Sequence, residues 1–101
     1  MTDQAKGPGW VWAIIETEGR EERLSALEDE ERGLRFIPVF SAQEDGVVGL
    51  RKFPRRPGVH LEVEAMHLAN VAREARAHGY DIFILDYEGK VLERLSPALD
   101  S

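Results

Sequence analysis

The sequence contains no cysteine among its 101 residues. This absence excludes a disulfide framework, thiol catalysis and cysteine-ligated zinc. No run approaches the about 20 consecutive apolar residues that span a bilayer, and the opening MTDQAKGPG lacks the basic and apolar regions of a secretory signal. We therefore expect a cytoplasmic protein that makes no membrane contact.

Signatures of catalysis and of nucleotide binding are also missing. Neither GxGxxG nor GxxxxGK[ST] occurs, and no serine lies in a nucleophile elbow. The formal net charge of −6 disfavours a nucleic-acid partner, because phosphate repels the chain at long range. These features predict a non-enzymatic protein without a cofactor or a metal site.

What the chain does contain suits one folded domain. Apolar residues make up 43% of the sequence and charged residues 32%, a balance typical of a globular domain. We expect a flexible leader at residues 1–8, a single domain at 9–96 and a tail at 97–101.

Several segments carry strand patterns. Residues 10–16 (WVWAIIE) and 80–86 (YDIFILD) are apolar on both alternating faces, which is typical of strands covered on both sides. Residues 34–40 also predict a strand, in which Pro38 marks an edge, a bulge or the end of pairing. Residues 91–95 should return as a hairpin partner after the turn YEGK.

Two other stretches test the choice between strand and helix. In residues 59–64 (VHLEVE) apolar side chains alternate with His60, Glu62 and Glu64, so we expect a strand with one wet face. Residues 22–28 fit either a helix or a short, partly exposed strand, and we prefer the strand.

Two helices are expected, at residues 42–51 and 64–78. Ser41 and Glu44 match the capping box that begins a helix, and Gly79 stands where a glycine commonly ends one. The predicted fold is therefore α+β: a single domain with a mixed, mostly antiparallel sheet of five or six strands and two helices packed on it.

The three histidines do not suggest a common site. His67 and His78 would lie on one helix face but about 16 Å apart along its axis, which is too far for one metal ion. Glu74 precedes His78 by four residues and should pair with it at the surface. His60 and Glu62 share the outward face of a strand, which we interpret as solvated surface; a catalytic pair is the alternative and requires a concave pocket there.

The stretch RKFPRRP, residues 51–57, is the candidate binding site. It places Arg51, Lys52, Arg55 and Arg56 around Phe53, and basic residues interleaved with an aromatic can bind phosphates and stack a base. The alternative interpretation is that Phe53 packs inward and the four cations solvate a loop.

Two stretches together resemble a known family. RFIPVFSAQEDG resembles the strand and capped helix of SseB-like proteins, the type III secretion enhancer-like family, and of related small bacterial families. HLEVEAMHLANVAREARAHGYDIFILDYEG resembles their later helix and strand, so the likeness runs over about residues 10–95. It departs at Gly46 and Gly49, where such helices more often carry alanine and larger residues. The resemblance implies an α+β fold with two helices and a role in protein interaction, with no catalytic residues to transfer.

We therefore expect a non-enzymatic protein-interaction or regulatory module. Its partner would be another protein or a second copy of the chain in a homodimer. The expected contact region comprises residues 34–40, residues 42–51 and the basic loop. The alternative is a binder of small anionic ligands or nucleic-acid phosphate that uses residues 51–57.

Overall fold

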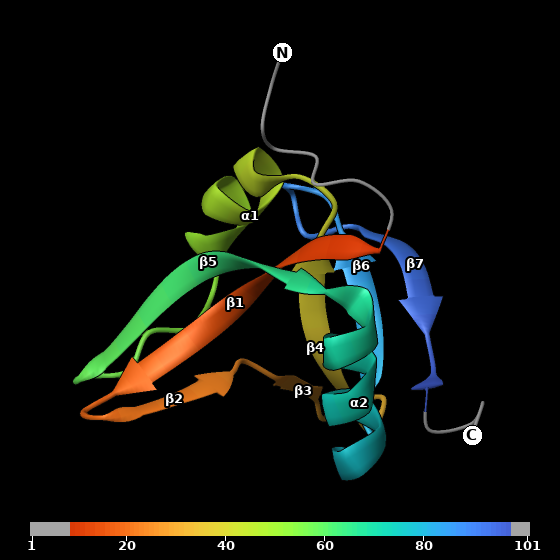
Figure 1. The fold of residues 1–101 in the computed structure, drawn as a ribbon, viewed down its shortest axis with the longest axis horizontal. Helices are drawn as coiled ribbons and strands as arrows, with labels where there is room; N and C mark the ends of the chain where they lie inside the picture. The colour runs from red at the N-terminus through yellow and green to blue at the C-terminus, as the bar shows by residue number, and fades with distance from the viewer. Residues whose placement is uncertain (1–8, 98–101) are drawn as a thin grey trace.

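Seven strands form one mixed sheet with a helix on each face in the computed structural model, which describes residues 9–97 (Figure 1). The elements are β1 Trp10–Glu18, β2 Glu21–Leu24, β3 Leu27–Asp29, β4 Leu34–Phe40, α1 Gln43–Leu50, β5 Val59–His67, α2 Leu68–His78, β6 Asp81–Leu85 and β7 Val91–Leu95. The predicted α+β class, the mixed sheet and the two helices are confirmed.

The expected count of five or six strands is wrong, because residues 22–28 contribute to two strands. The preference for strand in that stretch is confirmed, but the chain bends at Ser25 and Ala26. As a result β2 pairs with β1, whereas β3 pairs with β4.

The sheet divides into two arms that meet over a short contact. β1 pairs with β5 along its whole length, but with β4 only at Trp12↔Phe40 and Ala13↔Val39. Beyond that contact the two strands diverge, and β2 and β3 occupy the edges that they leave (Figure 1). Pro38 lies where β4 changes its partner from β3 to β1. Of the three alternatives expected for Pro38, the structure shows an interruption of pairing on this one side, while the ladder with β6 continues through Pro38↔Phe83.

Alternating side chains of the central strands fill two separate cores. On one face Val11, Ala13, Ile37 and their neighbours pack against Val71 and Ala75 of α2. On the other face Trp12, Ile14, Phe40, Leu61, Phe83 and Leu85 pack beneath α1 and the loop that follows it. The prediction that residues 10–16 are covered on both sides is therefore confirmed.

Both helices are shorter than expected at their N-termini. The N-cap of α1 is Ala42, and no side chain caps the helix, so the capping role predicted for Ser41 is wrong. Residues 64–67 extend β5 instead of beginning α2, because their backbone pairs with residues 10–13 of β1. The expected helix end is confirmed: Gly79 has a left-handed φ of 73°, which glycine adopts without a steric penalty.

The predicted single domain at 9–96 falls wholly within the described residues. The leader predicted at 1–8 lies outside them, as does the predicted tail except for its first residue. Within residues 9–97, neither α1 nor α2 has the length and apolarity needed to cross a membrane.

The two glycines of α1 explain how this short helix packs. A Cβ atom at Gly46 would lie 2.9 Å from Cγ1 of Val63, and one at Gly49 would lie 2.8 Å from Cε1 of Phe40. Phe40 is fully buried, so a methyl group added at Gly49 would press against a side chain that is packed in the core. Glycine therefore lets the helix backbone rest directly on the core, at the cost of helix propensity.

We predict that Gly49→Ala destabilises the protein although alanine is the better helix former. The overpacking cost of roughly 1–3 kcal/mol against Phe40 should exceed the about 1 kcal/mol gained in propensity. Urea denaturation would measure the loss, with Val47→Ala on the exposed face of α1 as the control, for which the change should stay within about 0.5 kcal/mol. Equal or greater stability of Gly49→Ala would show that the helix does not rest on Phe40 as described.

Candidate functional site

The basic loop, residues 51–57, does not gather its cations at one point. Lys52 Nζ donates to the carbonyl oxygen of Glu88 at 3.1 Å, whereas Arg56 Nη2 donates to Oε1 of Glu16 at 3.2 Å. Arg51 and Arg55 are exposed, and neither makes an ion pair with the residues that the structure describes. Lys52 and Arg56 of the predicted site therefore contact different parts of the protein.

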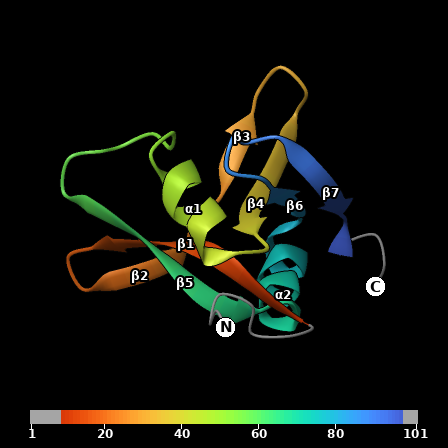
Figure 2. The same cartoon turned by 90° about the horizontal axis from the view of Figure 1, so that it is seen from above.

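Phe53 contacts the core that α1 covers, as the inward-packing interpretation expected. Its ring also forms part of a cavity of about 300 Å³, which we call the phenylalanine cavity. The cavity lies among α1, the β3–β4 hairpin and the β6–β7 hairpin, the elements seen around α1 in Figure 2. Its walls include Phe36, Phe40, Phe53, Phe83, Leu85 and Val91.

All four phenylalanines of the sequence line this one cavity. Phe36 of β4 and Phe83 of β6 stack with ring centroids 4.3 Å apart, because the parallel pairing of these strands brings both rings to one face. Phe40 follows on the same face of β4. The cavity wall therefore contains three phenylalanines that the strand register places on one face of the sheet, together with Phe53 of the basic loop.

The rim of the cavity is polar. Lys52, Arg32 and Asp29 border it, and Nε of Arg32 lies 3.7 Å from Oδ2 of Asp29. Lys52 donates only to a backbone carbonyl among the described residues, so its charge has no carboxylate partner there. An apolar interior with a net positive rim can accept an apolar group that carries a negative charge.

A second cleft, of about 600 Å³, lies where the two arms of the sheet diverge. The carboxylate of Glu16 lies in its wall and accepts from Ser25 Oγ at 2.9 Å, from Arg23 Nε at 3.0 Å and from Arg56. The Glu16 side chain is only 16% exposed, so these bonds compensate the cost of its burial. This clamp ties β2 and the basic loop to β1.

The pKa of Arg23 is raised above its ordinary value, chiefly because Glu18 accepts a hydrogen bond from its guanidinium. Desolvation, the next largest effect, lowers the pKa, and the charge of Glu16 raises it again. Arg23 therefore stays positively charged and keeps its bonds to both carboxylates wherever the carboxylates are ionised.

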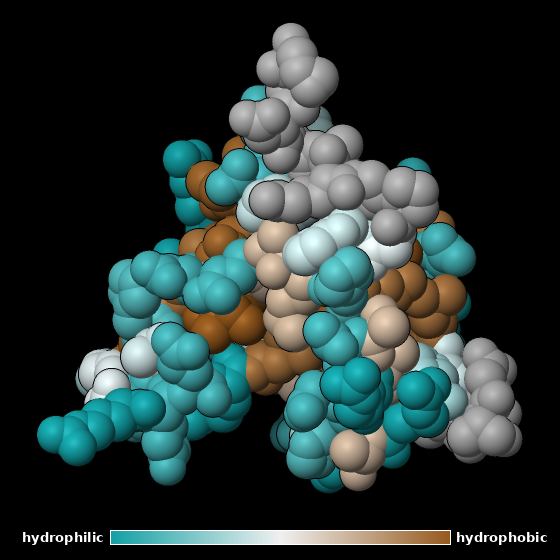
Figure 3. All heavy atoms as spheres, viewed as in Figure 1, coloured by the Kyte–Doolittle hydropathy of each residue, from teal (hydrophilic) through white to brown (hydrophobic). Residues whose placement is uncertain are grey.

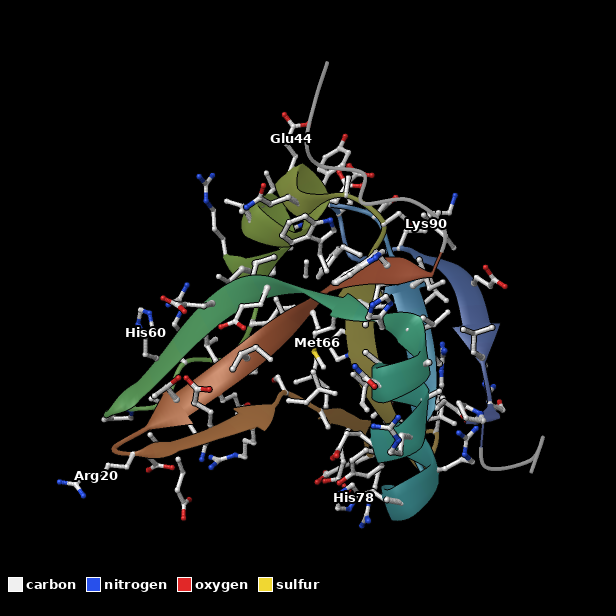
Figure 4. All side chains as sticks on the ribbon, in the orientation of Figure 1. Arg20, Glu44, His60, Met66, His78 and Lys90 are labelled. Atoms are coloured by element: carbon white, nitrogen blue, oxygen red, sulfur yellow. The ribbon has the colours of Figure 1, made fainter. Side chains whose placement is uncertain are left out.

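The histidines lie apart, as expected, but the prediction that His67 and His78 share a helix face is wrong, because His67 is the last residue of β5. His60 Nε2 lies 3.2 Å from Oε2 of Glu62, but both side chains are more than half exposed and neither lines the clefts described above. His78 lies 3.7 Å from Oε1 of Glu74, which confirms the predicted surface pair. Figure 4 shows His60 at the outer end of β5 and His78 at the lower end of α2. Among residues 9–97, no group of three acidic or histidine side chains could hold a metal ion.

Sequence reasoning singled out the basic loop but missed the convergence of the phenylalanines. Phe36 and Phe83 are far apart in the chain, and only the parallel β4–β6 pairing brings them together. The alternation of phenylalanine at 36 and 40 on one strand face was the available signal. The Glu16 clamp depends on the β1–β2 register, for which the sequence offered no comparable signal.

No known family model, curated protein or solved structure matches the chain. The resemblance to SseB-like proteins therefore stays a prediction.

We predict that Arg56→Gln loosens the basic loop with little effect on global stability. The Arg56–Glu16 ion pair is largely exposed on its arginine side and should contribute at most about 1 kcal/mol. The amides of Phe53 and Val59, which bond to the carbonyls of Leu50 and Arg56, should exchange with solvent several-fold faster in hydrogen-exchange NMR.

Arg55→Gln is the matched control, because it removes the same charge from the neighbouring residue without breaking an ion pair. Its exchange rates should equal those of the unaltered protein. Equal acceleration in both variants would show that the clamp does not hold the loop.

Proposed function

We propose that the protein is a non-enzymatic protein-interaction module that binds its partner through α1 and the β6–β7 hairpin. The observation that carries this proposal is the position of the exposed large hydrophobic side chains. Within residues 9–97 all of them come from these two neighbouring elements. We call them the hairpin–helix patch: Val47, Val48, Tyr87, Val91 and Leu92.

Three members of the patch share one surface feature. Val47, Val48 and Tyr87 line one shallow groove, and Lys52 at the end of α1 bonds to the β6–β7 turn at Glu88. That turn is shaped by Asp86, whose Oδ1 accepts from the amides of Glu88 and Lys90 at 2.9 Å. Contiguous apolar surface of this kind marks interaction sites, whereas scattered apolar residues do not.

The outer face of α2 has the opposite character. It carries exposed Arg73, Glu74, Arg76 and His78. Figure 3 shows hydrophilic colour over α2 and over the outer end of the β1–β5 arm, with hydrophobic surface over α1 and across the middle of this face. The contrast supports a contact surface at the α1 end of the molecule and provides a control surface at α2.

The free edge of β7 adds to the proposed surface. β7 pairs with β6 alone among the described strands, so its outer backbone groups can bond to a strand of a partner or of a second copy. The other long edge strand, β5, carries His60, Glu62 and Glu64 outward, and such charges oppose edge-to-edge pairing.

The proposed region shares α1 with the one expected from the sequence, and it adds the β6–β7 hairpin. The alternative, an anion binder that uses all four cations of the basic loop, has weaker support, because Arg56 is paired with the carboxylate of Glu16 and Lys52 points to a different element, the β6–β7 turn.

We predict that Val48→Gln combined with Leu92→Gln abolishes partner binding. Truncating central apolar contacts commonly costs a factor of about ten or more in affinity, and neither residue is buried. A tagged pull-down from nuclease-treated native lysate at moderate salt would measure the partner recovered, and sedimentation over a concentration series would measure self-association.

Ala69→Gln combined with Ala77→Gln on α2 is the matched control, since both alanines are exposed. The control should retain the partner that the patch variant loses. Equal recovery by both variants would contradict the proposed surface, and a partner recovered from a parallel untreated lysate but not from the nuclease-treated one would transfer support to the anion-binding alternative.

A further inference from the structure

We propose that the phenylalanine cavity receives an aromatic side chain flanked by carboxylates in a peptide segment of the partner. This inference rests on the proposed function and deepens it by naming the chemistry that the partner presents. Four observations support it: the composition of the cavity, its size, the charge of its rim and its continuity with the hairpin–helix patch.

The composition and size of the cavity suit one aromatic ring. Its walls combine all four phenylalanines with Leu27, Leu85 and Val91, and aromatic walls offer a further ring stacked or edge-to-face contacts. The volume of about 300 Å³ lies at the lower end of the range for ligand sites, so it holds a single side chain rather than a larger cofactor. Gly49 and Gly89 at the wall leave the space open.

The rim of the cavity itself carries more positive than negative charge, whereas the adjoining groove at the β3–β4 turn is lined by Glu28, Glu30 and Glu31. The rim carries two cations, Arg32 and Lys52, and one carboxylate, Asp29. Arg32 and Asp29 are already paired, which leaves the ammonium of Lys52 as the excess charge. A third nearby cation, Arg94, lies over the ring of Phe83 with 5.9 Å from Cζ to the centroid, but Oδ2 of Asp81 accepts a hydrogen bond from its Nε and forms an ion pair with its Nη2, which neutralises its charge.

Continuity with the patch favours a polypeptide over a free aromatic acid. Val91 belongs both to the cavity wall and to the hairpin–helix patch. A peptide segment can place one ring in the cavity and cover the neighbouring apolar residues at the same time, whereas a small aromatic carboxylate can fill only the cavity. The basic loop beside the cavity adds exposed Arg51 and Arg55, which further favour an acidic segment.

Three capped, fluorescently labelled peptides would test this inference by anisotropy: one with the core Glu-Phe-Glu, one with Gln-Phe-Gln and one with Glu-Ala-Glu. We expect Glu-Phe-Glu to bind best, at low ionic strength. Replacing its phenylalanine with alanine should weaken binding about tenfold or more. Replacing its glutamates with glutamine should weaken binding about two- to fivefold, the range of exposed ion pairs.

Two variants of the protein locate the site. Lys52→Gln should weaken Glu-Phe-Glu by about two- to fivefold and leave Gln-Phe-Gln unchanged, whereas Arg76→Gln on α2, with the same change of charge, should affect neither. Val91→Phe, at a half-exposed position, should fill the cavity and prevent binding of all three peptides without unfolding the chain.

Equal binding of the phenylalanine and alanine peptides, no binding of any peptide, or unchanged binding to Val91→Phe would overturn the inference. These failures are distinguishable from failure of the proposed function. If the patch variant still loses its partner in the pull-down, the interaction surface stands and only the chemistry assigned to the cavity is wrong.

Discussion

The rest of the structure depends on the short contact between β1 and β4. Within the described strands, β1 and β4 pair only at Trp12↔Phe40 and Ala13↔Val39. Because these central strands diverge after two residue pairs, the twisted sheet leaves a gap between its two arms. The gap exposes the edges that β2 and β3 occupy. It also opens the larger cleft beside Glu16, where a clamp of two arginines and a serine stabilises the carboxylate.

Phe40 connects this contact to the candidate binding surface. Its backbone pairs with β1, while its ring lies beneath α1. Because α1 meets that ring with glycines, the helix contributes almost no side chain to the core. Its valines at 47 and 48 consequently face outward, which is the reverse of an ordinary amphipathic helix. The exposed apolar surface of α1 is thus a consequence of the close packing beneath it.

The fold could be predicted from the sequence wherever local pattern and tertiary pairing agree. Residues 10–16 and 80–86, which are apolar on both faces, were correctly predicted to form strands. Gly79 correctly predicted the end of α2. Where they disagree, pairing prevails: residues 64–67 resemble the first turn of a helix but extend β5, since β1 offers them a full ladder of partners. Likewise, the capping box predicted at Ser41 does not form, and the helix begins after Ala42.

The candidate site was predictable only in part, because its residues meet through strand order. The basic loop stood out in the sequence as adjacent cations around one aromatic, and Phe53 and Lys52 do belong to the phenylalanine cavity. The other rings arrive from β4 and β6, which are neighbours only through a parallel crossover that contains both helices and β5. The four cations are neighbours in the sequence, but they do not form one site, because Lys52 and Arg56 contact different elements of the fold. The same reasoning makes Lys52 the member of the loop that we propose for recognition, since it alone combines a place at the aromatic rim with a charge that no described carboxylate neutralises.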